Sequence, residues 1–268
     1  MSDEAVLFER KDPGIAILTL NRPDRLNAWN GDLAARYFTL LDQCEADPEI
    51  KVIVVTGAGR GYCAGADMDS LQGIGNAGGQ QGGGENTAGN RPVYETAQLS
   101  KPIIAAINGA CAGIGMVQAL MCDLRFAASG IKFTTAFSRR GLIAEYGMSW
   151  VLPRLVGTSN ALDLMMSGRV IMSEEAKAMG MVNDVLPREE LMNHTLAYAA
   201  DMATNASPTS MSIIKRQIYA DAHRTLPEAS DAAIELMRAS LKRPDFKEGV
   251  ASYLAKRPPA FAPVNRDL

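Results

Sequence analysis

Two glycine-containing turns carry residues suited to chemistry. Residues 64–68 (AGADM) follow the buried run VIVVTGAG, and residues 113–115 (GIG) follow the run PIIAAINGACA. Glycine lets a ligand approach the backbone closely, and a turn that enters a helix leaves N–H groups without intrahelical partners. Two such turns could direct two N–H donors at one oxygen atom, the arrangement of an oxyanion hole. Tight packing of the turns against a sheet explains the same glycines equally well.

One carboxylate, Glu145, lies in an otherwise apolar segment, residues 141–147 (GLIAEYG). Apolar surroundings disfavour a charged carboxylate and raise its pKa toward that of a useful base. A solvated or helix-capping glutamate ahead of the helix entered at Ser149 is the alternative, and these residues alone favour that alternative.

Other catalytic patterns are absent from the sequence. The two histidines, His194 and His223, form no HExxH motif or Cys/His cluster, and there is no Gly-x-Ser-x-Gly elbow. The glycine string at residues 57–61 is followed by Tyr62, which breaks the GxGxxG pattern of a dinucleotide site. We therefore expect no metal site, and we interpret both histidines as solvated helix residues.

Composition narrows the class of protein. The 268 residues are 47% hydrophobic and 21% charged, as in soluble enzymes, and the net charge of −3 argues against nucleic-acid binding. The longest apolar stretch, residues 102–122, contains Asn108, Gln118 and three glycines, and no apolar signal core opens the chain. Four cysteines without CxxC spacing indicate free thiols. We expect a cytoplasmic protein with no membrane partner.

The elements that position these residues are α/β in the first two thirds of the chain and helical in the last third. Strands are expected where short β-branched runs lie between turn residues, and helices where apolar residues recur at helical spacing. A helix followed by a buried strand indicates a crossover and a partly parallel sheet. The predicted strands are residues 15–20, 51–56, 102–107, 122–128 and 131–134; the predicted helices are residues 32–46, 113–121 and 150–156, with further helix starts at residues 173–176, 187–190 and 227–228.

Residues 72–90 are rich in Gly, Gln, Asn and Ala and contain almost nothing apolar. Such a segment buries too little surface to offset its ordering entropy. We interpret it as a mobile loop over or beside a site, or as a tolerated surface insertion.

Seven segments, spread in order over nearly the whole chain, carry a resemblance to a known family. They are residues 21–28 (NRPDRLNA), 63–68 (CAGADM), 101–109 (KPIIAAING), 121–123 (MCD), 152–157 (LPRLVG), 176–185 (AKAMGMVNDV) and 256–258 (KRP). With them the chain resembles the crotonase superfamily, the enoyl-CoA hydratase/isomerase family. The resemblance implies an α/β fold, a crotonase-like spiral of ββα units, with a C-terminal helical trimerisation region. Residues 1–200 would form the core with the acyl-CoA site, and residues 201–268 would complete that site and build a homo-trimer or a hexamer (a dimer of trimers).

The resemblance also implies an oxyanion hole. In similar proteins, N–H groups at the positions matching Ala66 and Ile114 hold the thioester oxygen of an acyl-CoA. Charge builds on that oxygen as an enolate forms, so these donors favour the transition state. Ile114 stands where a glycine is common; its N–H remains, and its side chain narrows the acyl pocket. Coenzyme A is part of the substrate, and no separate cofactor is implied.

This chain departs from the family at two catalytic positions. Family hydratases use two glutamates, one for water and one for a proton, and the matching residues here are Val117 and Phe137, which are both apolar. A hydratase of the two-glutamate type is therefore disfavoured. Glu145 stands where single-carboxylate isomerases of the family carry an acid, and the resemblance favours a catalytic role for it.

The predicted activity is the conversion of a 3-enoyl-CoA to a 2-enoyl-CoA, with Glu145 as acid and base. The alternatives are an enoyl-CoA hydratase, an acyl-CoA hydrolase or lyase, and a non-catalytic acyl-CoA-binding protein. RNA binding, known in some members, is disfavoured by the charge and by the lack of a basic-aromatic stripe.

The remaining expected contacts are mainly with the nucleotide of coenzyme A. The resemblance places the nucleotide near Arg25 and Leu26 and along residues 64–66, and near a neighbouring subunit's C-terminal helix through Tyr253 and Lys256. A basic C-terminus that complements the helix dipole explains Lys256 as well. We expect Asp67 to cap the next helix. The predicted substrate contacts are Arg25, Leu26, Ala64, Asp67, Met68, Val117, Phe137, Tyr253 and Lys256.

Overall fold

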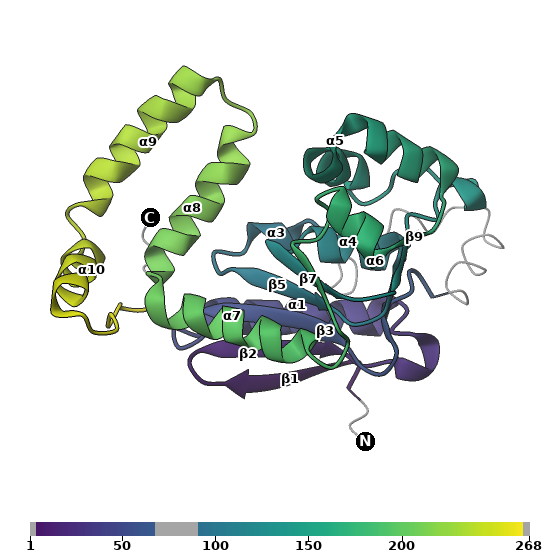
Figure 1. The fold of residues 1–268 in the computed structure, drawn as a ribbon, viewed down its shortest axis with the longest axis horizontal. Coiled ribbons are helices and arrows are strands. Elements are labelled where there is room, and N and C mark those ends of the chain that lie inside the picture. Colours follow the sequence, from purple (N-terminus) through teal and green to yellow (C-terminus); the bar gives the residue numbers. More distant parts are fainter. Residues whose placement is uncertain (1–3, 68–90, 265–268) are drawn as a thin grey trace.

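A computed structural model describes residues 4–67 and 91–264 and shows an α/β core from which a helical arm projects (Figure 1). Within these residues, six strands form one sheet in the order β1-β2-β3-β5-β7-β10. β1 pairs antiparallel with β2, and the other neighbours are parallel. These strands are β1 (Val6–Lys11), β2 (Ile15–Leu20), β3 (Val52–Gly57), β5 (Ile103–Ile107), β7 (Leu124–Ala128) and β10 (Asp184–Leu186).

The strands of a second sheet follow three of these strands along the chain. β3, β5 and β7 each lead through a short turn into β4 (Gly61–Cys63), β6 (Ala110–Ala112) and β8 (Lys132–Thr134). These short strands, with β9 (Ile171–Met172), make the order β4-β6-β8-β9. A helix then follows β6 and another follows β8, so the strand–strand–helix unit repeats. The predicted spiral of ββα units is confirmed.

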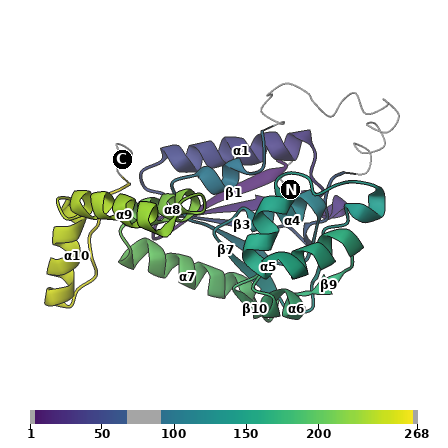
Figure 2. The same cartoon turned by 90° about the horizontal axis from the view of Figure 1, so that it is seen from above.

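Two helices cover opposite faces of the larger sheet (Figure 2). α1 (Gly31–Ala46) packs on β1 and β2, while α7 (Leu191–Asn205) packs on β2, β3, β5 and β7. α1 begins at Asn30, whose side chain accepts from the Leu33 N–H at 3.0 Å, a standard N-cap. The predicted helical stripe in residues 32–46 is confirmed as the buried face of α1. The core therefore lies between helix and sheet, as apolar periodicity predicts.

Shorter elements complete the core. α4 (Gly113–Leu120) is buried along its whole length. α5 (Met148–Ser167) extends the predicted helix across a non-helical Gly157. The remaining short elements are η1 (Pro23–Arg25), α3 (Glu95–Gln98), η3 (Ser138–Arg140) and α6 (Ser173–Ala178).

The last quarter of the chain forms the arm: α8 (Pro208–Asp221), α9 (Leu226–Ser240) and α10 (Pro244–Ala255). Ser207 caps α8, and α9 opens with a capping box between Thr225 and Glu228. α9 has no buried residue, and Tyr253 on α10 is 84% exposed. Among the described helices, none has the length and hydropathy that crossing a bilayer requires.

One sequence-based expectation about elements was wrong. The last third is not purely helical, since β10 returns the chain to the larger sheet. The helix start expected at residues 187–190 leads directly into α7, whose N-cap is Glu190 and where the Leu191 N–H donates to the Pro187 carbonyl at 3.1 Å. The division at residue 200 stays a prediction; that position falls within α7.

Candidate active site

The two glycine turns lie against each other. A Cβ placed on Gly113 would lie 3.8 Å from the Gly65 Cα, and one placed on Gly65 would lie 3.2 Å from the Ala112 carbonyl oxygen. Both glycines have positive φ, +106° at Gly65 and +49° at Gly113, which side chains rarely adopt. The structure thus brings Ala66 and Ile114, the next residue in each turn, close together.

The pairing of Ala66 leaves its own N–H unused. Ala66 forms a parallel bridge with Trp29, in which the Trp29 N–H donates to the Gly65 carbonyl at 2.8 Å and the Asp67 N–H donates to the Trp29 carbonyl at 3.0 Å. Successive N–H groups of an extended chain point in opposite directions, so the Ala66 N–H faces away from Trp29. Within residues 4–67 and 91–264 it has no hydrogen-bond acceptor.

Ile114 supplies the second N–H. It is the second residue of α4, and the first N–H groups of a helix have no intrahelical acceptor. Its side chain is almost fully buried, so the donor lies in a setting of low dielectric where a hydrogen bond to a developing charge is strong. The two N–H groups can therefore serve one oxygen atom.

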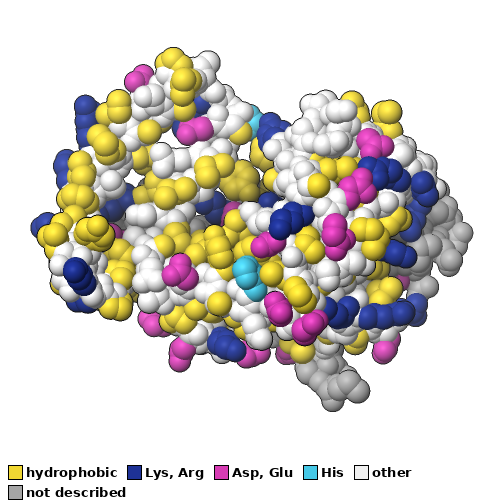
Figure 3. Space-filling model, viewed as in Figure 1, with side chains coloured by type: hydrophobic (Ala, Val, Ile, Leu, Met, Phe, Trp, Pro, Cys, Tyr) yellow, Lys and Arg dark blue, Asp and Glu magenta, His cyan; other side chains and the backbone are white. Residues whose placement is uncertain are grey.

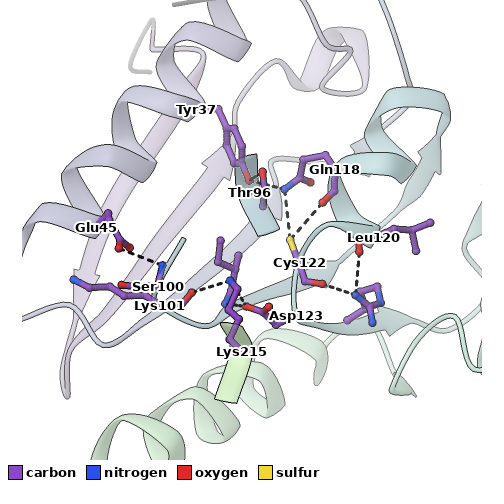
Figure 4. A network of polar contacts seen from close by, with 12 residues as sticks. Tyr37, Glu45, Thr96, Ser100, Lys101, Gln118, Leu120, Cys122, Asp123 and Lys215 are labelled. Carbon is purple, nitrogen blue, oxygen red and sulfur yellow. Dashed lines mark hydrogen bonds and ion pairs between the residues drawn. The ribbon is translucent and has the colours of Figure 1, made fainter. Parts of the chain in front are cut away.

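A buried polar network joins α4 to neighbouring elements through the Gln118 side chain (Figure 4). The Gln118 side chain donates to the Tyr37 hydroxyl at 2.8 Å and accepts from the Tyr62 hydroxyl at 2.5 Å. The Tyr37 hydroxyl also lies 3.2 Å from the Thr96 hydroxyl. Burial raises the pKa of both phenols, so they stay neutral donors. Because Gln118 belongs to α4, this network fixes the rotation of the helix and the direction of the Ile114 N–H.

Glu145 lies in the turn between η3 and α5. Its carbonyl accepts from the Met148 N–H at 2.9 Å, and its side chain is half-buried. Burial raises the pKa of the Glu145 carboxyl above its ordinary value. The helix-capping alternative is not seen, because Gly147 is the N-cap of α5 and no side chain caps it. The segment is less buried than its composition suggests, since Ile143 is 79% exposed.

Val117 and Phe137 are both buried and apolar in the structure. Val117 lies one helical turn after Ile114 on α4, so the two side chains share a face. Phe137 precedes η3 and belongs to the hydrophobic core. Neither position offers a group that could hold or activate water.

The turn that contains Arg25 and Leu26 lies beside the Ala66 strand. The Ala64 N–H donates to the Leu26 carbonyl at 3.1 Å. Asn27 is fully buried, and its amide donates to the Gly61 carbonyl at 2.8 Å. These bonds place Arg25 and Leu26 next to the glycine turns.

Asp67 has a partner that no sequence pattern indicated. Its carboxylate accepts from the Arg22 guanidinium at 2.8 Å, and the side chain is almost fully buried. Arg22 also donates to the Ala28 carbonyl at 2.5 Å. The ion pair therefore joins residues 22–28 to the Ala66 strand. Met68 and the predicted loop over residues 72–90 lie outside the described residues.

Tyr253 and Lys256 lie on α10 and at its end, far from the glycine turns of the same chain (Figure 1). The resemblance assigns them to the site of a neighbouring subunit, so a single chain does not test their role. Among the other predicted contact residues, the structure places Leu26, Ala64 and Asp67 beside the Ala66 turn and Val117 on the helix that carries Ile114.

A cavity of about 620 Å³ opens between α3, α5 and α8, and we call it the ring-lined cavity. Figure 3 shows a hollow between the arm and the α5 lobe, with hydrophobic side chains inside it. His223, expected to be a solvated helix residue, is exposed but lines this cavity; His194 is half-buried against Phe126. The lining of the ring-lined cavity includes Tyr94, Met121, Gly147, Trp150, Tyr219 and His223.

The sequence held one signal for this cavity. Lys215, Tyr219 and His223 recur every four residues, which places them on one face of α8 and its following turn. Lys215 anchors that helix, because its ammonium donates to the Asp123 carboxylate at 2.8 Å and to the Lys101 carbonyl at 3.2 Å (Figure 4).

The cysteines do not contribute a nucleophile. All four are free and buried. Burial raises the pKa of the Cys63 and Cys122 thiols to about 12, so both remain protonated at neutral pH.

Comparison with known proteins identifies the fold. An enoyl-CoA hydratase from Mycobacterium marinum is 51% identical, with a TM-score of 0.71 over 83% of this chain and 100% of that one. An enoyl-CoA hydratase from Bacillus anthracis is 27% identical, with a TM-score of 0.89 over 96% of this chain and 99% of that one. The crotonase-like fold is therefore confirmed.

Sequence comparison identifies the family. The family described as enoyl-CoA hydratase/isomerase matches residues 10–263. The 1,2-epoxyphenylacetyl-CoA isomerase of Escherichia coli K12 is 37% identical over 95% of this chain and 97% of its own length. A protein of Mycobacterium tuberculosis H37Rv named "probable enoyl-CoA hydratase" is 35% identical over 96% of this chain and 92% of its own. The chain belongs to the enoyl-CoA hydratase/isomerase family of the crotonase superfamily and is an enzyme of that family.

Proposed function

We propose that this enzyme binds acyl-CoA thioesters and converts a 3-enoyl-CoA to a 2-enoyl-CoA, with Glu145 as its single acid and base. The observation that carries the proposal is the juxtaposition of the Gly65 and Gly113 turns, which leaves the Ala66 and Ile114 N–H groups without partners within the described residues. Glu145 is the acid with a raised pKa in the turn before α5. Coenzyme A enters as part of the substrate.

The mechanism uses one carboxylate twice. The Glu145 carboxylate takes a proton from C2, and the electrons of that C–H bond move into an enolate whose oxygen accepts from Ala66 and Ile114. The protonated Glu145 then delivers the proton to C4, and the double bond comes to lie between C2 and C3. Atoms and charge balance, and no water is consumed. A raised carboxyl pKa strengthens the base.

One observation favours isomerisation over hydration. Hydratases of this family need two glutamates, and Val117 and Phe137 occupy those positions as buried apolar side chains. The names of similar proteins do not separate the two activities, since a relative at 37% identity is named an isomerase and a solved structure at 51% identity is named a hydratase. Hydration is therefore the second candidate.

The test uses 3-hexenoyl-CoA and 2-hexenoyl-CoA with wild-type protein and Glu145→Gln, with products followed by mass and ultraviolet absorbance. We expect the wild type to convert the 3-enoyl thioester, and the variant to lose about 100- to 10,000-fold in rate, the usual contribution of a positioned acid–base group. Glu189→Gln makes the same chemical change at an exposed position and should be fully active.

Binding of hexanoyl-CoA, measured by calorimetry, separates chemistry from affinity. We expect Glu145→Gln to bind it as the wild type does. Rapid hydration of 2-hexenoyl-CoA would contradict the isomerase and would mean that another group activates water. Full isomerase activity of Glu145→Gln would contradict the role of Glu145.

We also propose that the arm builds a homo-trimer or a dimer of trimers and that Arg25, Leu26 and Ala64, together with a neighbour's Tyr253 and Lys256, hold coenzyme A. Large apolar side chains on the arm support the assembly, since Leu254 is 75% exposed. Leu254→Asp should shift the sedimentation coefficient toward that of a monomer. A wild type that already sediments as a monomer, with no change in Leu254→Asp, would contradict the assembly.

A further inference from the structure

The ring-lined cavity has the size and lining of a ligand site. Its volume of about 620 Å³ lies within the range of pockets that hold small molecules. α8 forms one wall, the start of α5 forms another, and Tyr94 and Leu99 from the α3 region complete it. Most of the lining is apolar, which suits an acyl group better than a nucleotide.

Aromatic rings form its most regular wall. Trp150 on α5 faces Tyr219 on α8 with ring centroids 6.3 Å apart and planes 23° apart. His223 lies at the same centroid distance from Trp150, with planes 33° apart. These three rings come from segments about 70 residues apart in sequence, and all three line the cavity.

The Trp150 ring is held in place before any ligand arrives. The Arg154 guanidinium lies over it, 4.0 Å from the ring centroid, and donates to the Trp150 carbonyl at 2.8 Å. Lys215 anchors α8 through Asp123, so Tyr219 is fixed as well. A wall set in advance loses little entropy when a flat ligand packs on it.

The cavity lies at the opposite end of α4 from Ile114 and beside the turn that carries Glu145. Met121 ends α4, the helix that carries Ile114, and Gly147 lies two residues after Glu145. A Cβ on Gly147 would lie 3.3 Å from the Met121 methyl carbon, so these two lining residues touch. Seven residues of helix separate Ile114 from Met121, about 10 Å of rise. An acyl chain that leaves the oxyanion hole and passes Glu145 would enter the cavity at this point.

We propose that the ring-lined cavity selects a planar aromatic ring at the distal end of the acyl chain, so that the preferred substrates are aryl-substituted acyl-CoA thioesters. The inference rests on the proposed function, because it assumes an acyl-CoA in the oxyanion hole. It names the class of acyl group that this site takes.

The experiment compares 4-phenylbutanoyl-CoA with 4-cyclohexylbutanoyl-CoA, two saturated thioesters that differ in the ring alone. The cyclohexyl group is the more hydrophobic, so a merely apolar pocket would prefer it. A wall of aromatic rings prefers phenyl, because an aromatic ring makes edge-to-face or offset contacts with Trp150 and Tyr219 that a cyclohexyl group cannot make. We expect calorimetry to show about three- to tenfold tighter binding of the phenyl thioester by the wild type.

Variants assign the preference to the wall. Trp150→Leu should abolish the phenyl preference, and Trp150→Phe should retain most of it. Tyr94→Leu removes a half-exposed lining ring that has no ring contact with α8, so it guards against disturbed packing of that helix; it should weaken the preference without lowering the melting temperature. Tyr198→Leu removes an exposed ring of α7 outside the cavity and should change nothing.

The outcomes separate this inference from the proposed function. Equal or tighter binding of the cyclohexyl thioester would overturn the ring selectivity and leave the isomerase intact. A phenyl preference together with inert 3-hexenoyl-CoA would support the ring selectivity and contradict the proton transfer. Failure of both saturated thioesters to bind would overturn both.

Discussion

The glycine turns and the ring-lined cavity differ in the groups they offer to a ligand: main-chain groups in the turns and side chains in the cavity. Around Ala66 and Ile114 the functional groups are backbone N–H donors, fixed by a strand bridge and a helix start. In the cavity they are side-chain rings, brought together by α5 and α8 from distant parts of the sequence. One region is specified by where glycine is needed, and the other by which side chains are present.

This difference teaches how the two regions respond to substitution. A side-chain change at Ile114 leaves its N–H in place, whereas a change at Trp150 removes the group that does the selecting. The oxyanion hole should therefore fail only when the backbone itself is altered, and the cavity should change gradually. The predictions below test that contrast.

The largest effect should come from removing a backbone donor. Ile114→Pro deletes the N–H in the first turn of α4, where helices tolerate proline. We expect a loss of about 100- to 1,000-fold in kcat with 3-hexenoyl-CoA, the usual result of losing one oxyanion donor. Ile114→Ala keeps the N–H and should stay within about tenfold of the wild type. Equal losses in both variants would show that the side chain, and not the donor, matters.

The next effect concerns the anchor of α8. Lys215→Met leaves the Asp123 carboxylate without its cation, and the Lys215 side chain is only 7% exposed. Removing one partner of a buried pair costs about 3 kcal/mol, so the urea midpoint should fall. The Asp123 carboxylate also accepts from the Ile103 N–H at 2.8 Å, and Asp123→Asn removes the charge but keeps an acceptor. The double variant with Asp123→Asn should be more stable than Lys215→Met alone, as a double-mutant cycle will show. Additive losses would mean that the two groups do not interact.

The pH dependence of Glu145 gives a smaller effect with a definite sign. Its folded pKa lies above the ordinary 4.5, so between those two values the folded protein binds more protons than the unfolded chain. As the pH rises through that window, the free energy of unfolding of the wild type therefore falls relative to that of Glu145→Gln. Isomerase activity rises over the same window, because the carboxylate becomes available as a base. Urea unfolding of both proteins across about pH 4 to 7 checks the first statement. A difference that does not vary with pH would show that the carboxyl is not perturbed.

The smallest effect should appear at the nucleotide. Arg25 is exposed, so Arg25→Ala should weaken binding of hexanoyl-CoA by about two- to fivefold, and less at high salt. Hexanoyl-pantetheine lacks the nucleotide and should bind both proteins alike. Equal weakening of both ligands would place Arg25 away from the phosphates.

The sequence predicted the central strands and helices because their apolar periods are strong. The run at residues 15–20 and the stripe of α1 appear in the structure within a residue or two. β1 was missed because it is an edge strand whose residues Glu9, Arg10 and Lys11 are exposed and show no alternation. β9 and β10 have two and three residues, too few to form a pattern.

For the site, short-range signals were readable and long-range partners were not. The glycines that follow two buried runs indicated both turns. The pairing of Asp67 with Arg22 gave no local signal, because Arg22 lies 45 residues away and the two meet only in the fold. The helix that Asp67 was expected to cap falls outside the described residues, so that expectation stays a prediction. The contact between Trp150 and His223 could not be predicted either, because no local pattern relates α5 to the end of α8.

A reactive centre made of main-chain groups has a consequence for descent. Point mutations at the codons for Ala66 and Ile114 exchange side chains but, proline apart, transmit the same donors to the next generation. Lineages can then replace the acid at positions such as 117, 137 and 145 while an enolate is still stabilised. New reactions of the same intermediate then require a new acid or base, but not a new oxyanion hole.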